Sequence, residues 1–192
     1  MHYETIFQEI YRKLHPIEDS GQVADYIPEL AYVDPDQFGV HLTTIDGNKF
    51  AFGDAKKRFS IQSISKVFTF VLAYSRIKSN IWERTGLEPA GTPFNSLVQL
   101  EYDKGLPRNP FINTIGYNEK VALSERKTGY RNYALVNLMK SFGNIRNDID
   151  IVMDIYFHIC SIEMNCQELS QSFLFLANNG VVPYSGEQIL SA

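Results

Sequence analysis

Residues 59–70 read FSIQSISKVFTF, and this stretch decides the fold of the chain. Starting at Ser60, apolar side chains recur at the spacing of a buried helix, namely at Ile64, Val67, Phe68, Val71 and Leu72. The only charge inside the stretch is Lys66. Because an unpaired buried ammonium is very costly, this lysine must either find a partner or reach a cleft. The stretch therefore predicts a core helix that carries polar chemistry in its first turn.

Ser63 and Lys66 form an SxxK tetrad at the start of this helix. Residues three apart on a helix share a face, so the hydroxyl and the amine can meet. A serine becomes a good nucleophile when a base takes its proton, and a lysine serves as that base when burial lowers its pKa. The helix N-terminus opposes protonation of the amine and favours a nearby oxyanion. The same tetrad marks β-lactamases and penicillin-binding proteins, although SxxK also occurs by chance around a solvated lysine.

The composition bounds the class of protein. The chain has 192 residues, with 18 basic and 22 acidic side chains, 44% hydrophobic residues and 21% charged residues. These values are typical of one globular domain with a real core, and they argue against disorder, collagen-like repeats and coiled coil. A net charge of −4 gives no electrostatic reason to bind nucleic acid or an anionic membrane.

Two cysteines, Cys160 and Cys166, lack the spacing of a zinc site or a CxxC pair. We expect free thiols and no metal or organic cofactor. The N-terminal residues lack the order of a signal peptide, and no stretch approaches the ~20 apolar residues of a membrane span. We therefore expect a cytoplasmic protein.

The remaining pattern is one hairpin followed mostly by helices. Segments 38–45 and 49–53 flank Asp46, Gly47 and Asn48, a strong turn signal. Helical stripes are predicted over residues 3–14, 131–142, 149–160 and 165–179, and ordered loops over 88–97 and 104–113. This order predicts an α+β fold. Because a lone hairpin is not stable by itself, the sheet is expected to be incomplete in this chain.

Five strings resemble the bacterial serine-dependent glutaminases: VADYIPELAYVDPDQFGV, RFSIQSISKVF, GTPFNSLVQLEYDKGLPRNPFIN, ALVNLMKSFGN and YFHICSIEMNCQELSQSFLFLANNG. They cover nearly the whole chain in consistent order. The resemblance implies a β-lactamase-like fold, with an antiparallel sheet beside a helical cluster. It also implies hydrolysis of L-glutamine to L-glutamate and ammonia, without a metal, by a homodimer or homotetramer.

The family's roles transfer to matching positions of this chain. Ser63 matches the nucleophile and Lys66 the base. The positions implied to bind substrate are Tyr26, Gln62, Ser63, Asn113, Glu125, Asn132 and Tyr156. One acid for the α-ammonium and several neutral donors for the α-carboxylate are what free glutamine requires. Taken singly, Tyr26 and Tyr156 are equally compatible with plain packing in the core.

The chain also departs from its family. We expect a single domain over residues 1–192 that lacks an internal helical block after Asn113. It also lacks the C-terminal region, which in the family carries a KSG strand, a pocket tyrosine and half of the oxyanion hole. Either the natural polypeptide holds further residues, which we favour because the site positions keep their residue types, or the chain is a shortened family member.

Two other functions stay open at this point. The first is a non-catalytic glutamine-binding or regulatory protein. The second is a β-lactam-reactive serine acylase, which would need a KTG motif on a strand. Lys127, Thr128 and Gly129 spell KTG, but in a helical context.

Overall fold

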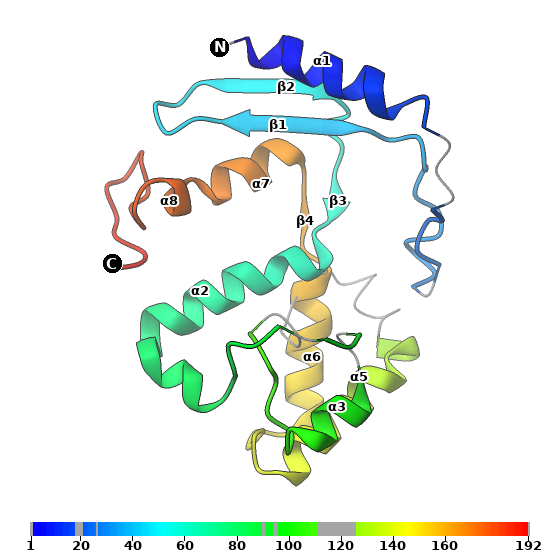
Figure 1. Cartoon of the computed structure of the whole chain (residues 1–192), viewed down its shortest axis with the longest axis vertical. Helices are drawn as coiled ribbons and strands as arrows, with labels where there is room; N and C mark the ends of the chain where they lie inside the picture. The colour runs from blue at the N-terminus through cyan, green and yellow to red at the C-terminus, as the bar shows by residue number, and fades with distance from the viewer. Residues whose placement is uncertain are drawn as a thin grey trace. The chain divides into compact units, whose positions relative to one another are not determined.

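The computed structural model describes residues 2–17, 21–25, 27–89, 91–93, 96–110 and 126–191. The chain divides into two compact units, the first from residues 1–25, 30–59 and 163–192 and the second from 26–29 and 60–162. Figure 1 shows the hairpin with its helices and the separate group of helices. The expected α+β class with an incomplete sheet is confirmed.

The first unit is built on the predicted hairpin. Strands β1 (Gly39–Thr43) and β2 (Lys49–Gly53) pair antiparallel, with Val40 opposite Phe52. Gly47 has φ of +89°, which a turn between the strands requires and which only glycine adopts freely.

Helix α1 (Tyr3–Leu14) packs against β2 through aromatic rings (Figure 1). The Tyr3 and Phe50 ring centroids lie 4.9 Å apart, and those of Tyr11 and Phe52 lie 5.4 Å apart. The predicted core-facing stripe of this helix is only partly buried: Phe7 is 7% exposed, whereas Ile6, Ile10 and Leu14 are 39–50% exposed. A two-stranded sheet is too narrow to cover the whole stripe.

The predicted helix over residues 165–179 is two helices, α7 (Cys166–Ser172) and α8 (Leu174–Ala177), separated at Phe173. A capping box begins α7, because Asn165 accepts from the Glu168 N–H at 2.8 Å and Glu168 accepts from the Asn165 N–H at 3.0 Å. Helix α7 packs on β1. The second half of the chain is not wholly helical, since β4 (Glu163–Met164) pairs with β3 (Phe59–Ser60).

The second unit is helical. It begins with a 3-10 turn, η1 (Gln62–Ile64), and continues through α2 (Ser65–Ile77) and a second 3-10 segment, η2 (Lys78–Glu83). The stripe starting at Ser60 thus becomes an α-helix only from Ser65. Helix α3 (Leu97–Tyr102) lies between the two proline-rich loops and was not predicted; Ser96 caps it by accepting from the Gln99 N–H at 3.2 Å.

The core of this unit lies between α5 (Tyr130–Ser141) and α6 (Ile149–Cys160). Met153 and Phe157 of α6 are 0% and 1% exposed, and the half-buried side chains packed against them are Tyr133, Val136, Ile149 and Tyr156. Both helices match their predicted spans, with Gly143 at φ +79° after α5. In the part of the chain that the structure describes, no helix is long and apolar enough to cross a membrane.

Asp148 begins α6, and its Oδ1 accepts from the N–H groups of Asp150 at 2.9 Å and Ile151 at 3.3 Å. Replacing Asp148 by alanine leaves these donors without their cap, so we expect a loss of about 1 kcal/mol in the free energy of unfolding, measured by urea denaturation. Asp148→Asn keeps the acceptor oxygen and is expected to retain most of that stability. Equal losses in the two variants would contradict the capping role.

Candidate active site

Ser63 and Lys66 lie at the junction between η1 and α2. Ser63 is exposed in the 3-10 turn, whereas Lys66, in the first turn of α2, is only 7% exposed. A hydroxyl at the surface can meet a substrate, and an amine withdrawn from water can act as a base. The chain therefore separates the two groups by environment while keeping them three residues apart.

Gln62, the residue before the candidate nucleophile, has φ of +44°. This backbone conformation is unfavourable for residues other than glycine, so interactions with neighbouring groups must stabilise it. The Ser65 hydroxyl, which is fully buried, donates to the Gln62 carbonyl at 2.6 Å. The Gln62 Nε2 amide donates to Ser60 Oγ at 3.2 Å. These two bonds fix the turn that presents Ser63.

The end of α6 supports the same turn from the other side. Helix α6 packs against η1, and the Ile61 N–H donates to the Ile162 carbonyl at 2.8 Å. Ile61, Cys160 and Ser161 are 1%, 3% and 0% exposed. The candidate dyad is thus backed by an interior from which water is excluded.

This environment acts on Lys66. Burial lowers the pKa of the Lys66 amine from its ordinary value of 10.5, while the negative charge of a Cys160 thiolate would raise that pKa. Burial is the larger of the two effects. A lowered pKa increases the fraction of neutral amine, which is the form that accepts a proton from a serine.

Cys160 is the residue near the site that the sequence reasoning missed. The sequence treats it as a thiol outside any disulfide at the end of a helical stripe, and the structure confirms that it forms no disulfide and is buried. Its position within electrostatic reach of Lys66 depends on how α6 packs against η1, which no local pattern reveals.

The expected substrate-binding residues are only partly described. Asn132 lies in the first turn of α5 and Tyr156 on α6; both are half-buried, and the two helices pack together. The Tyr156 ring meets the Phe157 ring edge-on at 5.3 Å, so part of it does belong to the core. Tyr26, Asn113 and Glu125 lie outside the described residues.

Gly129 is the N-cap of α5 and separates that helix from the helical residues 126–128. The continuous helix that would place Asn132 on one face with Glu125 is therefore interrupted. The KTG string of Lys127, Thr128 and Gly129 lies in this helical turn and cap, and not on a strand, as expected.

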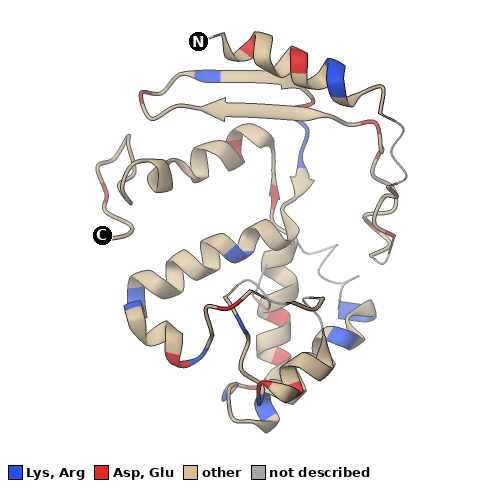
Figure 2. Ribbon diagram, in the orientation of Figure 1, with Lys and Arg blue, Asp and Glu red and all other residues tan. Residues whose placement is uncertain are grey.

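Charged side chains elsewhere are interspersed in sign along both units (Figure 2). Among the described residues, no group of three or more His, Cys, Asp or Glu side chains is arranged to hold a metal ion.

Comparison with known proteins identifies relatives of this chain. The family model named Glutaminase matches residues 21–116 and 113–192. A glutaminase of Saccharophagus degradans is 47% identical over 221 residues, covering 98% of this chain and 72% of that protein. A glutaminase of Aliarcobacter butzleri is 45% identical over 224 residues, covering 100% of this chain and 73% of that protein.

Solved structures give the same result. The probable glutaminase ybaS superposes with a TM-score of 0.87 at 30% identity, covering 98% of this chain and 71% of that one. A Bacillus glutaminase superposes with a TM-score of 0.75 at 26% identity, covering 86% and 67%. Fold and sequence thus define a class of amidohydrolase. The chain belongs to the glutaminase family.

The lowered pKa of Lys66 predicts how stability changes with pH. Between the folded-state pKa and 10.5, the unfolded chain binds more protons than the folded chain, so stability rises with pH through that window. Lys66→Met removes the free-energy cost of burying a charged amine. In urea denaturation we expect the variant to be the more stable protein at neutral pH, with the difference shrinking as pH approaches 10.5.

Lys57→Met, at an exposed lysine, is the matched control and is expected to show no such trend. A stability difference for Lys66→Met that stays constant from pH 7 to 10.5 would mean that the amine is not desolvated.

Proposed function

We propose that the chain hydrolyses L-glutamine by acyl transfer through Ser63. Lys66 accepts the hydroxyl proton as Ser63 Oγ attacks the δ-carboxamide carbon, and that proton then leaves with the amide nitrogen as ammonia. Water attacks the γ-glutamyl ester, and L-glutamate is released with the serine restored. The observation that carries this proposal is the almost complete burial of Lys66 three residues after an exposed Ser63, at the junction of η1 and α2.

The local structure supports each chemical demand of the first step. The start of α2 places the positive end of a helix dipole beside the serine, which favours an anion forming there and opposes protonation of Lys66. The Ser63 backbone N–H is the nearest candidate donor to that oxyanion.

We assign substrate binding to Gln62, Asn132 and Tyr156 together with Tyr26, Asn113 and Glu125. Glu125 would pair with the α-ammonium, and the amide and phenol groups would bind the α-carboxylate. Gln62 is half-buried and adjoins the nucleophile, which supports its place beside the reacting carboxamide.

We also propose that residues 1–192 form one family domain that lacks an internal block after Asn113. The two parts of the family match meet at residues 113–116, and alignment with a 47% identical relative extends over 221 positions although this chain has 192 residues. A cytoplasmic homodimer or homotetramer completes the proposal.

Ser63→Ala is the direct test of the nucleophile. We expect ammonia release from glutamine to fall by ~10³-fold or more, with an unchanged far-UV circular dichroism spectrum, because the attacking oxygen is removed. Ser75→Ala, at an exposed serine further along α2, is the matched control and should keep full activity. Retained turnover in Ser63→Ala would refute the assignment.

The rival functions give different results with the unaltered chain. A non-catalytic relative would bind glutamine in calorimetry without releasing ammonia, and a β-lactam-reactive acylase would hydrolyse nitrocefin. We expect ammonia release and no nitrocefin hydrolysis.

A further inference from the structure

The second unit contains a cavity of about 480 Å³, and its described lining shares no residue with the described part of the candidate active site. We infer that this cavity binds a small aromatic carboxylate, with the ring system against its apolar floor and the carboxylate at its arginines. The volume lies within the range of ordinary small-molecule sites.

The walls of the cavity are held in place by hydrogen bonds. Thr85 Oγ1 and the Gly86 N–H both donate to the Pro107 carbonyl, at 3.3 and 2.8 Å. On the opposite wall, Lys140 Nζ donates to the Asn147 carbonyl at 2.7 Å. Because hydrogen bonds fix both walls without a ligand, binding loses little conformational entropy by ordering them.

The floor of the cavity is apolar. Phe70 and Ala73 come from α2, Ile81 from η2, Met139 from α5 and Val152 from α6. Phe70 is held by Trp82, with the ring centroids 5.9 Å apart. An aromatic ring and a thioether facing one space favour a flat aromatic ligand, which stacks on the first and contacts the sulfur of the second.

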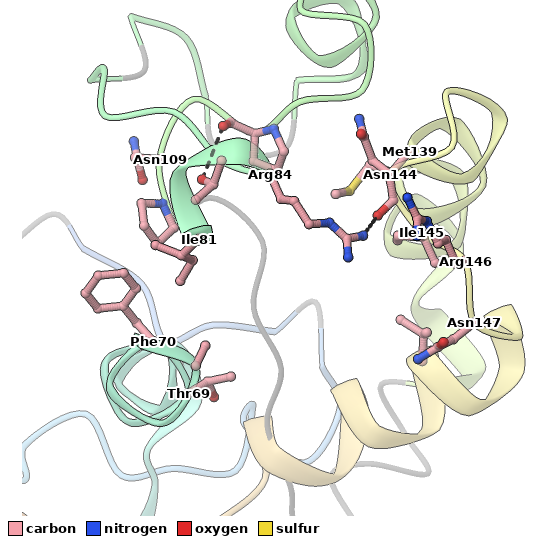
Figure 3. A pocket seen from close by; sticks show the side chains of 15 residues that line it. Thr69, Phe70, Ile81, Arg84, Asn109, Met139, Asn144, Ile145, Arg146 and Asn147 are labelled. Atoms are coloured by element: carbon pink, nitrogen blue, oxygen red, sulfur yellow. Dashed lines mark hydrogen bonds between the residues drawn. The ribbon is translucent and has the colours of Figure 1, made fainter. Parts of the chain in front are cut away.

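The described lining of the cavity is positively charged. The described lining residues include Arg84 and Arg146 and neither Asp nor Glu. Arg84 donates from Nη2 to the Asn144 carbonyl, and Figure 3 shows its side chain extending toward Asn144. This bond uses one of five guanidinium donors and fixes the direction of the group. Arg146 makes no hydrogen bond or ion pair within the described part of the chain, so its fork is open to a carboxylate.

Two ligands that differ only in charge test the proposal: 1-naphthaleneacetate and its neutral amide, 1-naphthaleneacetamide. We expect the carboxylate to bind one saturable site with a Kd on the order of 0.1–1 mM. The amide should bind about fivefold more weakly. Calorimetry gives the affinities, and ¹³C-methyl methionine NMR gives the location: the Met139 signal should shift with saturation, and the Met164 signal should not.

Two variants separate the contribution of the Arg146 charge from that of the apolar floor, and a third serves as a control. Arg146→Gln should weaken the carboxylate about three- to fivefold and leave the amide unchanged. Ala73→Phe fills the floor and should abolish binding of both ligands. Arg76→Gln, an exposed arginine of α2 outside the cavity, is the matched control and should change neither affinity.

Equal affinity for the two ligands, an unchanged Met139 signal, or insensitivity to Arg146→Gln would overturn the proposal, as would no binding up to about 10 mM. Because no readout depends on turnover, the result is separate from that of the glutamine reaction. Ser63→Ala should bind 1-naphthaleneacetate as the unaltered chain does.

Discussion

The constraint on which the rest depends is the burial of the Lys66 amine at the start of α2. Withdrawing an ammonium from water is expensive, so the fold must gain enough elsewhere to hold it there. The gain comes from the packing around α6, where Met153 and Phe157 are essentially inaccessible to water. Burial in the same unit lowers the pKa of the Lys66 amine.

The turn that carries Ser63 contains an energetically unfavourable backbone conformation. Gln62 is held at positive φ, and the buried Ser65 hydroxyl and the Ile61–Ile162 backbone bond keep it there. Backbone strain of this kind is common at functional sites, where the surrounding structure holds a residue in a rarely populated conformation. Helix α2 then has two functions along its length, since Phe70 and Ala73, beyond its first turn, line the floor of the cavity.

Sequence patterns predicted the secondary-structure elements that are determined by residues close together in the chain. The hairpin around Gly47 and the helices predicted over residues 131–142 and 149–160 each depend on residues close in sequence, and all are confirmed. Helix α3 was missed because Leu97–Tyr102 is short and lies between prolines.

The sequence proposes the candidate site by residue type but gives no information on its environment. Spacing identified Ser63 and Lys66, whereas the exposure of one and burial of the other depend on tertiary packing. The proximity of Cys160 to Lys66 needed the packing of α6 against η1, and the cavity needed segments far apart in the chain. Periodicity also overestimated the burial of α1, because it cannot tell how wide the opposing sheet is.

The most direct measurement is a titration of Lys66 itself, by NMR of ¹³Cε-labelled lysine, with Lys66→Arg identifying the signal. A midpoint clearly below 10.5 is the predicted result. A midpoint at or above 10.5 would show that the amine is hydrated or held as a cation, and Lys66 would then be unable to serve as the base.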